Sequence, residues 1–185
     1  CTVGEILLLR IAAHVLERQD GDRRLFGQGE RGSDVVLIEP HAIDVHRARD
    51  VLNLLRPEVI EANVDHIRAA VAKLDKPQLV FTAHSIPEAM AANCEYAAQL
   101  QEAGSLIAEA LGIEQWRVVY QSRSGSPMQP WLGPDICDYL RELNAQGIKN
   151  VVVAPIGFVS DHMEVVYDLD FEAQNLANEL GLRMI

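Results

Sequence analysis

The chain has 185 residues, 49% hydrophobic and 23% charged, which is the composition of a globular domain long enough to bury one core. Its formal net charge of -11, without any basic run, disfavours binding to nucleic acid. No apolar run is long enough to span a bilayer and the first residues do not form a signal peptide, so a cytoplasmic protein is expected.

The first 56 residues carry no assigned motif. The spacing of apolar residues predicts a helix over residues 4–18, followed by a polar, glycine-rich loop at 19–33 and a strand at 34–38. The three cysteines are widely spaced and form no C-x-x-C pair, so reduced thiols are expected. The chain begins with Cys1 and ends, at residues 182–185, in what reads as half a strand, so a piece of a longer protein is expected.

From residue 57 onward, predicted helices and strands alternate. Helices are expected at residues 58–74, 87–111, 135–146 and from about 160 to 181, and strands at 78–82, 117–120 and 149–154. This alternation predicts right-handed crossovers and an α/β fold with a doubly wound parallel sheet. Ligands bind outside the carboxyl ends of such strands, where the loops at 83–87, 121–134 and 155–162 are expected to converge.

The last predicted helix carries a row of acidic residues. Glu164, Asp168 and Glu172 are four apart and share one side of the helix, beside an aliphatic row that is expected to pack on the sheet. Like charges at this spacing repel one another, which favours a bound cation. The alternative is that Asp161 and Glu164 form a capping box at the start of the helix, with no ligand. Spacing alone leaves both interpretations open.

Two further residues lie in the converging loops. His84 follows the strand at 78–82, and with Glu164 it would form a pair suited to a divalent metal or to proton transfer. The alternative is a hydrogen-bonded loop histidine. Trp131 is either a hydrophobic plug or the apolar wall for a flat aromatic ligand. The serines of the 121–134 loop are expected to make local turn hydrogen bonds.

Three motifs occur together in this part of the sequence. They are Phe81-Thr-Ala-His-Ser-Ile-Pro87, Gln121-Ser-Arg followed by Pro130-Trp-Leu-Gly-Pro134, and Pro155-Ile-Gly-Phe-Val-Ser-Asp-His-Met-Glu-Val-Val-Tyr-Asp-Leu-Asp170. In combination they resemble the second, C-terminal lobe of ferrochelatase, which inserts ferrous iron into a porphyrin in haem biosynthesis. The resemblance covers about residues 57–185 and implies two similar doubly wound lobes with the porphyrin between them. Residues 1–56 do not resemble the first lobe.

The resemblance also implies roles for individual residues. His84 and Glu164 correspond to the active-site histidine and glutamate that meet the metal, and we expect them to face each other across the macrocycle plane. Asp168 and Glu172 continue the acidic path for metal or protons. Trp131 and His162 fall in the porphyrin pocket.

The resemblance implies that Fe2+ is a substrate and that no organic cofactor is needed. Some members also hold a two-iron, two-sulfur cluster near a C-terminal segment that this sequence does not reach. The forms Ala-His-Ser-Ile-Pro and Gly-Phe-Val-Ser-Asp-His look like the bacterial branch, which favours coproporphyrin III over protoporphyrin IX.

Two alternatives remain. One is a cobalt or nickel tetrapyrrole chelatase, whose sites generally use more histidines. The other is a non-catalytic lobe that binds a metal or a partner without turnover.

Overall fold

A computed structural model describes residues 54–124, 128–158 and 163–185. The predicted helix at 4–18, loop at 19–33 and strand at 34–38 therefore lie outside the described residues. The described elements follow one another as α3 (Pro57–Val71), β1 (Gln78–His84), α4 (Glu88–Ala91), α5 (Tyr96–Leu111), β2 (Trp116–Gln121), α6 (Ile136–Ala145), β3 (Asn150–Ala154), α7 (Met163–Val165), the π-helix η1 (Val166–Ala173), α8 (Gln174–Leu180) and β4 (Arg183–Met184). No helix among them is long and apolar enough to cross a membrane.

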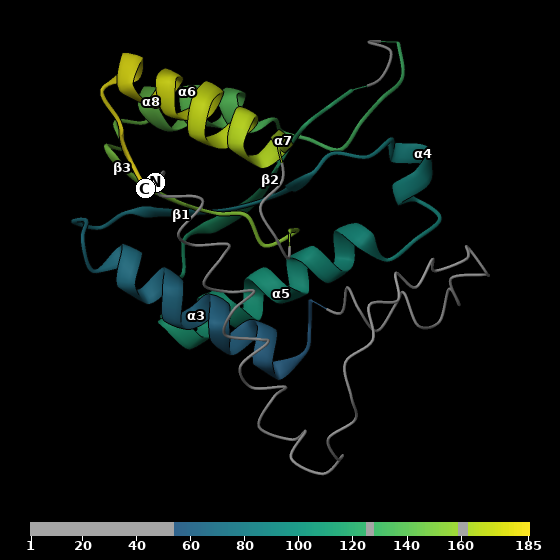
Figure 1. Ribbon diagram of the computed structural model, residues 1–185, viewed down its shortest axis with the longest axis horizontal. Coiled ribbons are helices and arrows are strands. Elements are labelled where there is room, and N and C mark those ends of the chain that lie inside the picture. The colour runs from purple at the N-terminus through teal and green to yellow at the C-terminus, as the bar shows by residue number, and fades with distance from the viewer. Residues whose placement is uncertain (1–53, 125–127, 159–162) are drawn as a thin grey trace, which may run out of the picture.

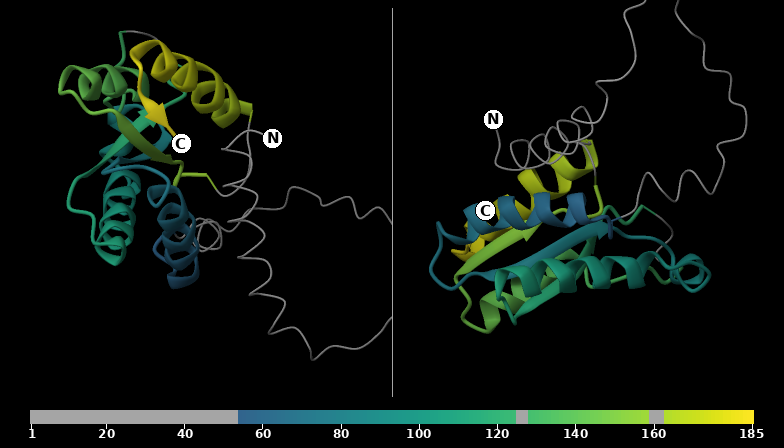
Figure 2. Two further views of the ribbon diagram at one scale, coloured as in Figure 1. Left: turned by 90° about the vertical axis from the view of Figure 1, so that its left-hand side faces the viewer. Right: turned by 90° about the horizontal axis from the view of Figure 1, so that it is seen from below.

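The described strands form one parallel sheet in the order β2-β1-β3-β4. Helices α3 and α5 cover one face, and α6 with the continuous helix α7-η1-α8 covers the other (Figures 1 and 2). This confirms the predicted α/β fold with a doubly wound parallel sheet. Because β1 and β2 pair in parallel with His84 opposite Gln121, their carboxyl ends lie side by side.

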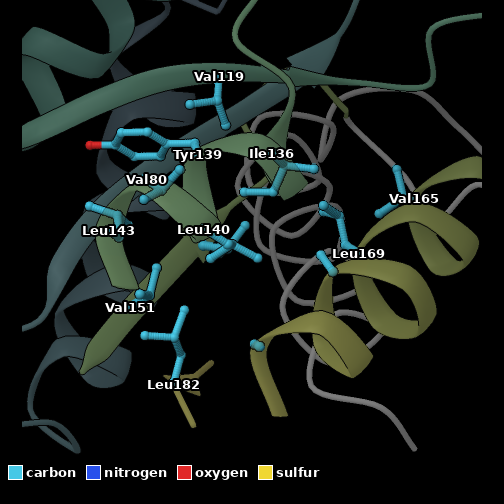
Figure 3. Close-up of a cluster of buried hydrophobic side chains, with 13 residues drawn as sticks. Val80, Val119, Ile136, Tyr139, Leu140, Leu143, Val151, Val165, Leu169 and Leu182 are labelled. Carbon is cyan, nitrogen blue, oxygen red and sulfur yellow. The ribbon is translucent and has the colours of Figure 1, made fainter. Parts of the chain in front are cut away.

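Each face of the sheet has its own apolar core. Figure 3 shows the core under α6 and the last helix, where Val80, Val119 and Leu140 are buried between sheet and helices. The aliphatic row of the last helix faces this core as predicted. Its buried members are Val165, Leu169, Ala173 and Ala177, and Leu176 and Leu180 are half-buried against them.

Three local features differ from the sequence prediction. The helix predicted at 87–111 is interrupted between α4 and α5, where the Asn93 amide donates a hydrogen bond to the carbonyl of Ala89. Asparagine side chains compete in this way with helical backbone bonds. His84 is the last residue of β1 rather than the residue beyond it, and the centre of the acidic helix is a π-helix.

The segment after β3 lies against β1 with no room for a side chain at Gly157. The Gly157 N–H donates to the carbonyl of Thr82 at 3.3 Å. A β carbon built on Gly157 would lie 2.7 Å from Cβ of Ala83, a distance that real β carbons essentially never show, and 3.0 Å from its Cα. Glycine is therefore required where the two backbones meet, one residue before His84.

Replacing Gly157 with alanine is expected to separate these two segments. The added methyl group should lower the free energy of unfolding by about 1–3 kcal/mol, the usual cost of overpacking, measured by urea denaturation. The control is Gly133→Ala, whose methyl group would meet no atom within 4 Å and should change the free energy by less than about 0.5 kcal/mol. Equal stability of the two variants would contradict the tight contact.

Candidate active site

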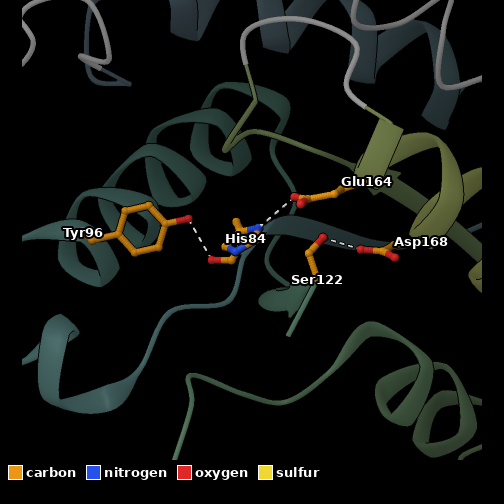
Figure 4. Close-up of polar contacts among 5 residues, drawn as sticks. All are labelled: His84, Tyr96, Ser122, Glu164 and Asp168. Carbon is orange, nitrogen blue, oxygen red and sulfur yellow. Dashed lines mark hydrogen bonds and ion pairs between the residues drawn. The ribbon is translucent and has the colours of Figure 1, made fainter. Parts of the chain in front are cut away.

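The central feature of the site is the contact between His84 and Glu164. Nδ1 of His84, at the end of β1, lies 3.3 Å from Oε2 of Glu164 in α7 (Figure 4). The two side chains are in direct contact with each other, so no ring lies between them in this structure. The expectation that they face each other across a macrocycle stays a prediction.

This pair is too exposed to be an important source of stability. The side chains of His84 and Glu164 are 33% and 49% exposed to solvent. Ion pairs this open to water contribute at most about 1 kcal/mol to the free energy of unfolding. An ionised carboxylate beside Nδ1 favours the proton on that nitrogen. The other ring nitrogen, Nε2, then carries the lone pair, so the imidazole can accept a proton or donate to a metal ion.

The next acid along the helix meets the end of the neighbouring strand. Asp168, in η1, accepts a hydrogen bond from the hydroxyl of Ser122, the residue after β2 (Figure 4). The predicted local turn bond of this serine is thus wrong, since its partner is 46 residues away. Ser122 has φ of 61°, a left-handed conformation that is uncommon for serine and concentrates at functional sites.

Beyond Asp168 the acidic row borders a small open cavity of about 150 Å³. Its polar lining residues are Gln121, Ser122, Arg123, Asp135, Cys137, Asp168 and Glu172, so one arginine lies among three carboxylates. Partial burial, with the negative charges of Asp135 and Glu172, raises the pKa of the Cys137 thiol to about 11. The cavity therefore disfavours the negatively charged form of Cys137, first because the thiol is partly buried and then because carboxylates lie near it.

Trp131 belongs to a loop bonded to the segment after His84. The N–H of Leu132 donates to the carbonyl of Ile86, and the N–H of Glu88 donates to the carbonyl of Pro130. Trp131 is half-buried, and its indole N–H is buried without a hydrogen-bond partner among the described residues. Both interpretations, plug and ligand wall, remain compatible with this placement.

His162 and Asp161 lie outside the described residues, so the structure places neither the second predicted porphyrin contact nor the capping box. Within residues 54–124, 128–158 and 163–185, no group of three or more potential metal ligands gathers at one point.

Sequence reasoning missed two residues of the site. The side chain of Gln121, 1% exposed, has neither amide atom paired within the described part of the chain, and it lines the cavity beside Asp168. The signal available in the sequence was a polar residue, Gln121, at the end of a mostly apolar strand. Tyr96, the first residue of α5, donates its hydroxyl to the carbonyl of His84 at 2.9 Å, and no sequence pattern indicated this contact.

Comparisons with known proteins agree on one family. A family model described as Ferrochelatase matches residues 54–185. The "Ferrochelatase" of Rhodopirellula baltica is 47% identical over 133 residues, covering 69% of this chain and 38% of the relative. The "Coproporphyrin III ferrochelatase" of Nocardia farcinica is 48% identical over 139 residues, covering 68% and 40%. That of Streptomyces griseus subsp. griseus is 43% identical over 166 residues, covering 78% and 44%. The chain spans about two fifths of the length of these relatives.

The exposure of the His84 and Glu164 pair predicts that its loss hardly affects folding. His84→Ala and Glu164→Gln should each lower the free energy of unfolding by less than about 1 kcal/mol in urea denaturation. Leu140→Ala, in the core of Figure 3, provides the contrast and should cost about 2–5 kcal/mol. A large loss in either site variant would mean that the pair is a structural element.

The raised pKa of Cys137 predicts slow alkylation at neutral pH. The thiolate reacts with iodoacetamide, and a pKa of about 11 leaves about one thiol in a thousand ionised at pH 8. The rate at Cys137, measured by peptide mass spectrometry, should keep rising up to about pH 11, with the exposed Cys94 as internal comparison. Glu172→Gln removes one negative charge and should speed the reaction at pH 8. A rate that levels off near neutral pH would contradict the raised pKa of Cys137.

Proposed function

The chain belongs to the ferrochelatase family, and on this premise we propose that it supplies the metal-handling lobe of an enzyme that inserts ferrous iron into a porphyrin. The contact between His84 and Glu164 at the strand ends carries this proposal. Several relatives are named coproporphyrin III ferrochelatase, which favours coproporphyrin III over protoporphyrin IX as the substrate of this chain. The N-terminal residues 1–56 stay unassigned, and residues 57–185 form the C-terminal lobe.

The reaction explains the types of residue in the pair. Inserting Fe2+ into a porphyrin releases two N–H protons, so the site needs a base that accepts them. With its Nδ1 beside the Glu164 carboxylate, His84 presents Nε2 to the macrocycle as proton acceptor or transient iron ligand. Glu164 stabilises the imidazolium that forms, because its negative charge lies 3.3 Å away.

The remaining acids give the protons or the metal a route away from the pair. Asp168 is the next carboxylate along the helix, and Glu172 follows at the cavity. Asp168 holds the hydroxyl of Ser122, which can pass a proton because a hydroxyl both donates and accepts. We assign this row as the acidic path.

The porphyrin is assigned to the side of the pair where the Trp131 loop lies. Trp131 provides an aromatic ring for stacking, and its unpartnered indole N–H can donate to a polar group of the ligand. His162 is assigned to the same pocket from its sequence position. Because His84 and Glu164 are in contact, we assign both to one face of the porphyrin, with the opposite wall supplied by residues other than this pair.

The test is anaerobic incubation of the purified chain with ferrous iron and either coproporphyrin III or protoporphyrin IX, followed by absorbance. We expect metalloporphyrin formation, faster with coproporphyrin III. His84→Ala should slow insertion by about 100-fold or more, the usual contribution of a positioned acid or base. His66→Ala, on α3, is the matched control and should keep the wild-type rate.

Each alternative has its own outcome. Insertion of cobalt or nickel in preference to iron would assign a different tetrapyrrole chelatase. Binding of porphyrin without insertion, in a chain that is folded by circular dichroism, would favour the non-catalytic lobe. An unchanged rate in His84→Ala would remove His84 from the mechanism.

A further inference from the structure

The carbonyl of His84 lies at a point where β1 has lost a strand neighbour. Strand β3 pairs with β1 only as far as Phe81, which lies opposite Ala154. Alternate carbonyls of a strand point to the same side, so those of Thr82 and His84 both face the side of β3. The Thr82 carbonyl accepts a hydrogen bond from the N–H of Gly157, and the His84 carbonyl accepts one from the hydroxyl of Tyr96. The Tyr96 hydroxyl thus supplies to His84 the hydrogen bond that a neighbouring strand would otherwise donate.

The position of Tyr96 is itself tightly fixed. Helix α5 packs so closely on the sheet that a β carbon on Gly104 would lie 2.8 Å from the Trp116 ring and 3.1 Å from the Phe81 ring. The helix therefore cannot slide without disturbing this contact. Tyr96 is half-buried, and burial together with Tyr120 and Cys94 raises its pKa to about 12. The phenol accordingly remains a hydrogen-bond donor over the whole physiological pH range.

His84 is thus held from two directions (Figure 4). The Tyr96 hydroxyl holds its backbone carbonyl at 2.9 Å, and the Glu164 carboxylate lies 3.3 Å from its side chain. On the β2 side, the end of β1 is held by the hydrogen bond from the Ser85 N–H to the Gln121 carbonyl at 2.8 Å. On the other side the Tyr96 hydroxyl holds it, and without that bond the strand end could shift and carry the His84 side chain away from Glu164. The ion pair alone cannot prevent this shift, because it is half-exposed and weak.

We propose that Tyr96 is a positioning residue that fixes the orientation and tautomer of the His84 imidazole through the His84 carbonyl. The inference rests on the proposed function only in that His84 is the reacting imidazole. Tyr96 needs no contact with iron or porphyrin for this role. Removal of its hydroxyl leaves the ring packing in place but frees the carbonyl, so the imidazole loses its fixed approach to Glu164.

The test measures the tautomer of His84 directly. In protein labelled with 15N-histidine, long-range proton–nitrogen spectra at a pH where imidazoles are neutral distinguish Nδ1–H from Nε2–H, and His84→Gln assigns the signal. We expect the wild-type protein to favour Nδ1–H. Tyr96→Phe should lower the ratio of Nδ1–H to Nε2–H by about threefold or more, because the contact between Nδ1 and the Glu164 carboxylate is partly lost. Replacement of Tyr96 by p-aminophenylalanine restores a donor and should restore the ratio.

The control is Tyr139→Phe, which removes a buried tyrosine hydroxyl on α6 instead of α5. It should leave the His84 tautomer unchanged. An unchanged ratio in folded Tyr96→Phe, the same fall in Tyr139→Phe, or wild-type protein with no Nδ1–H preference would each overturn the inference. A changed ratio in a chain that inserts no iron would support the positioning role and count against the proposed function, so the two failures are distinct.

Discussion

The contact between Gly157 and Ala83 is the constraint on which the candidate site depends. Apolar cores on both faces stabilise the sheet, but they do not determine how near the segment after β3 comes to the end of β1. That distance is set where two backbones meet without room for a β carbon. His84 follows Ala83 directly, and Glu164 lies seven residues after Gly157. The Gly157 contact positions the segment after β3 beside His84, while the buried Val165 and Leu169 hold the helix that carries Glu164 on the sheet.

The fold was predictable because its signals are periodic and local. Alternation of apolar strands with amphipathic helices, three of which are followed by a glycine (Gly112, Gly147 and Gly181), specifies a doubly wound parallel sheet without long-range information. The break before α5 and the π-helix were not predictable in this way. The first depends on an asparagine side chain that bonds to its own helix, and the second on a hydrogen-bond pattern that leaves no distinct spacing in a short segment.

The candidate site was predictable in its members but not in its geometry. Parallel strands bring their carboxyl ends to one edge, so the position of His84 and the spacing of the acids were sufficient to place them together. Side-chain direction depends on tertiary contacts. The hydrogen bond from Ser122 to Asp168 and that from Tyr96 to His84 join residues 46 and 12 positions apart, and no pattern in the sequence encodes either.

The π-helix has a consequence for the alignment of the carboxylates. In an α-helix, residues four apart are rotated by about 40° relative to each other, so the third acid of the row would be turned by about 80° from the first. A helix closed by bonds to the fifth residue has more residues in each turn, and each residue turns by less. Because most of the segment from Glu164 to Glu172 belongs to this wider turn, the drift of the acidic row around the helix axis is smaller than in an α-helix. The three carboxylates therefore lie nearer to one side of the helix than α-helical spacing would place them.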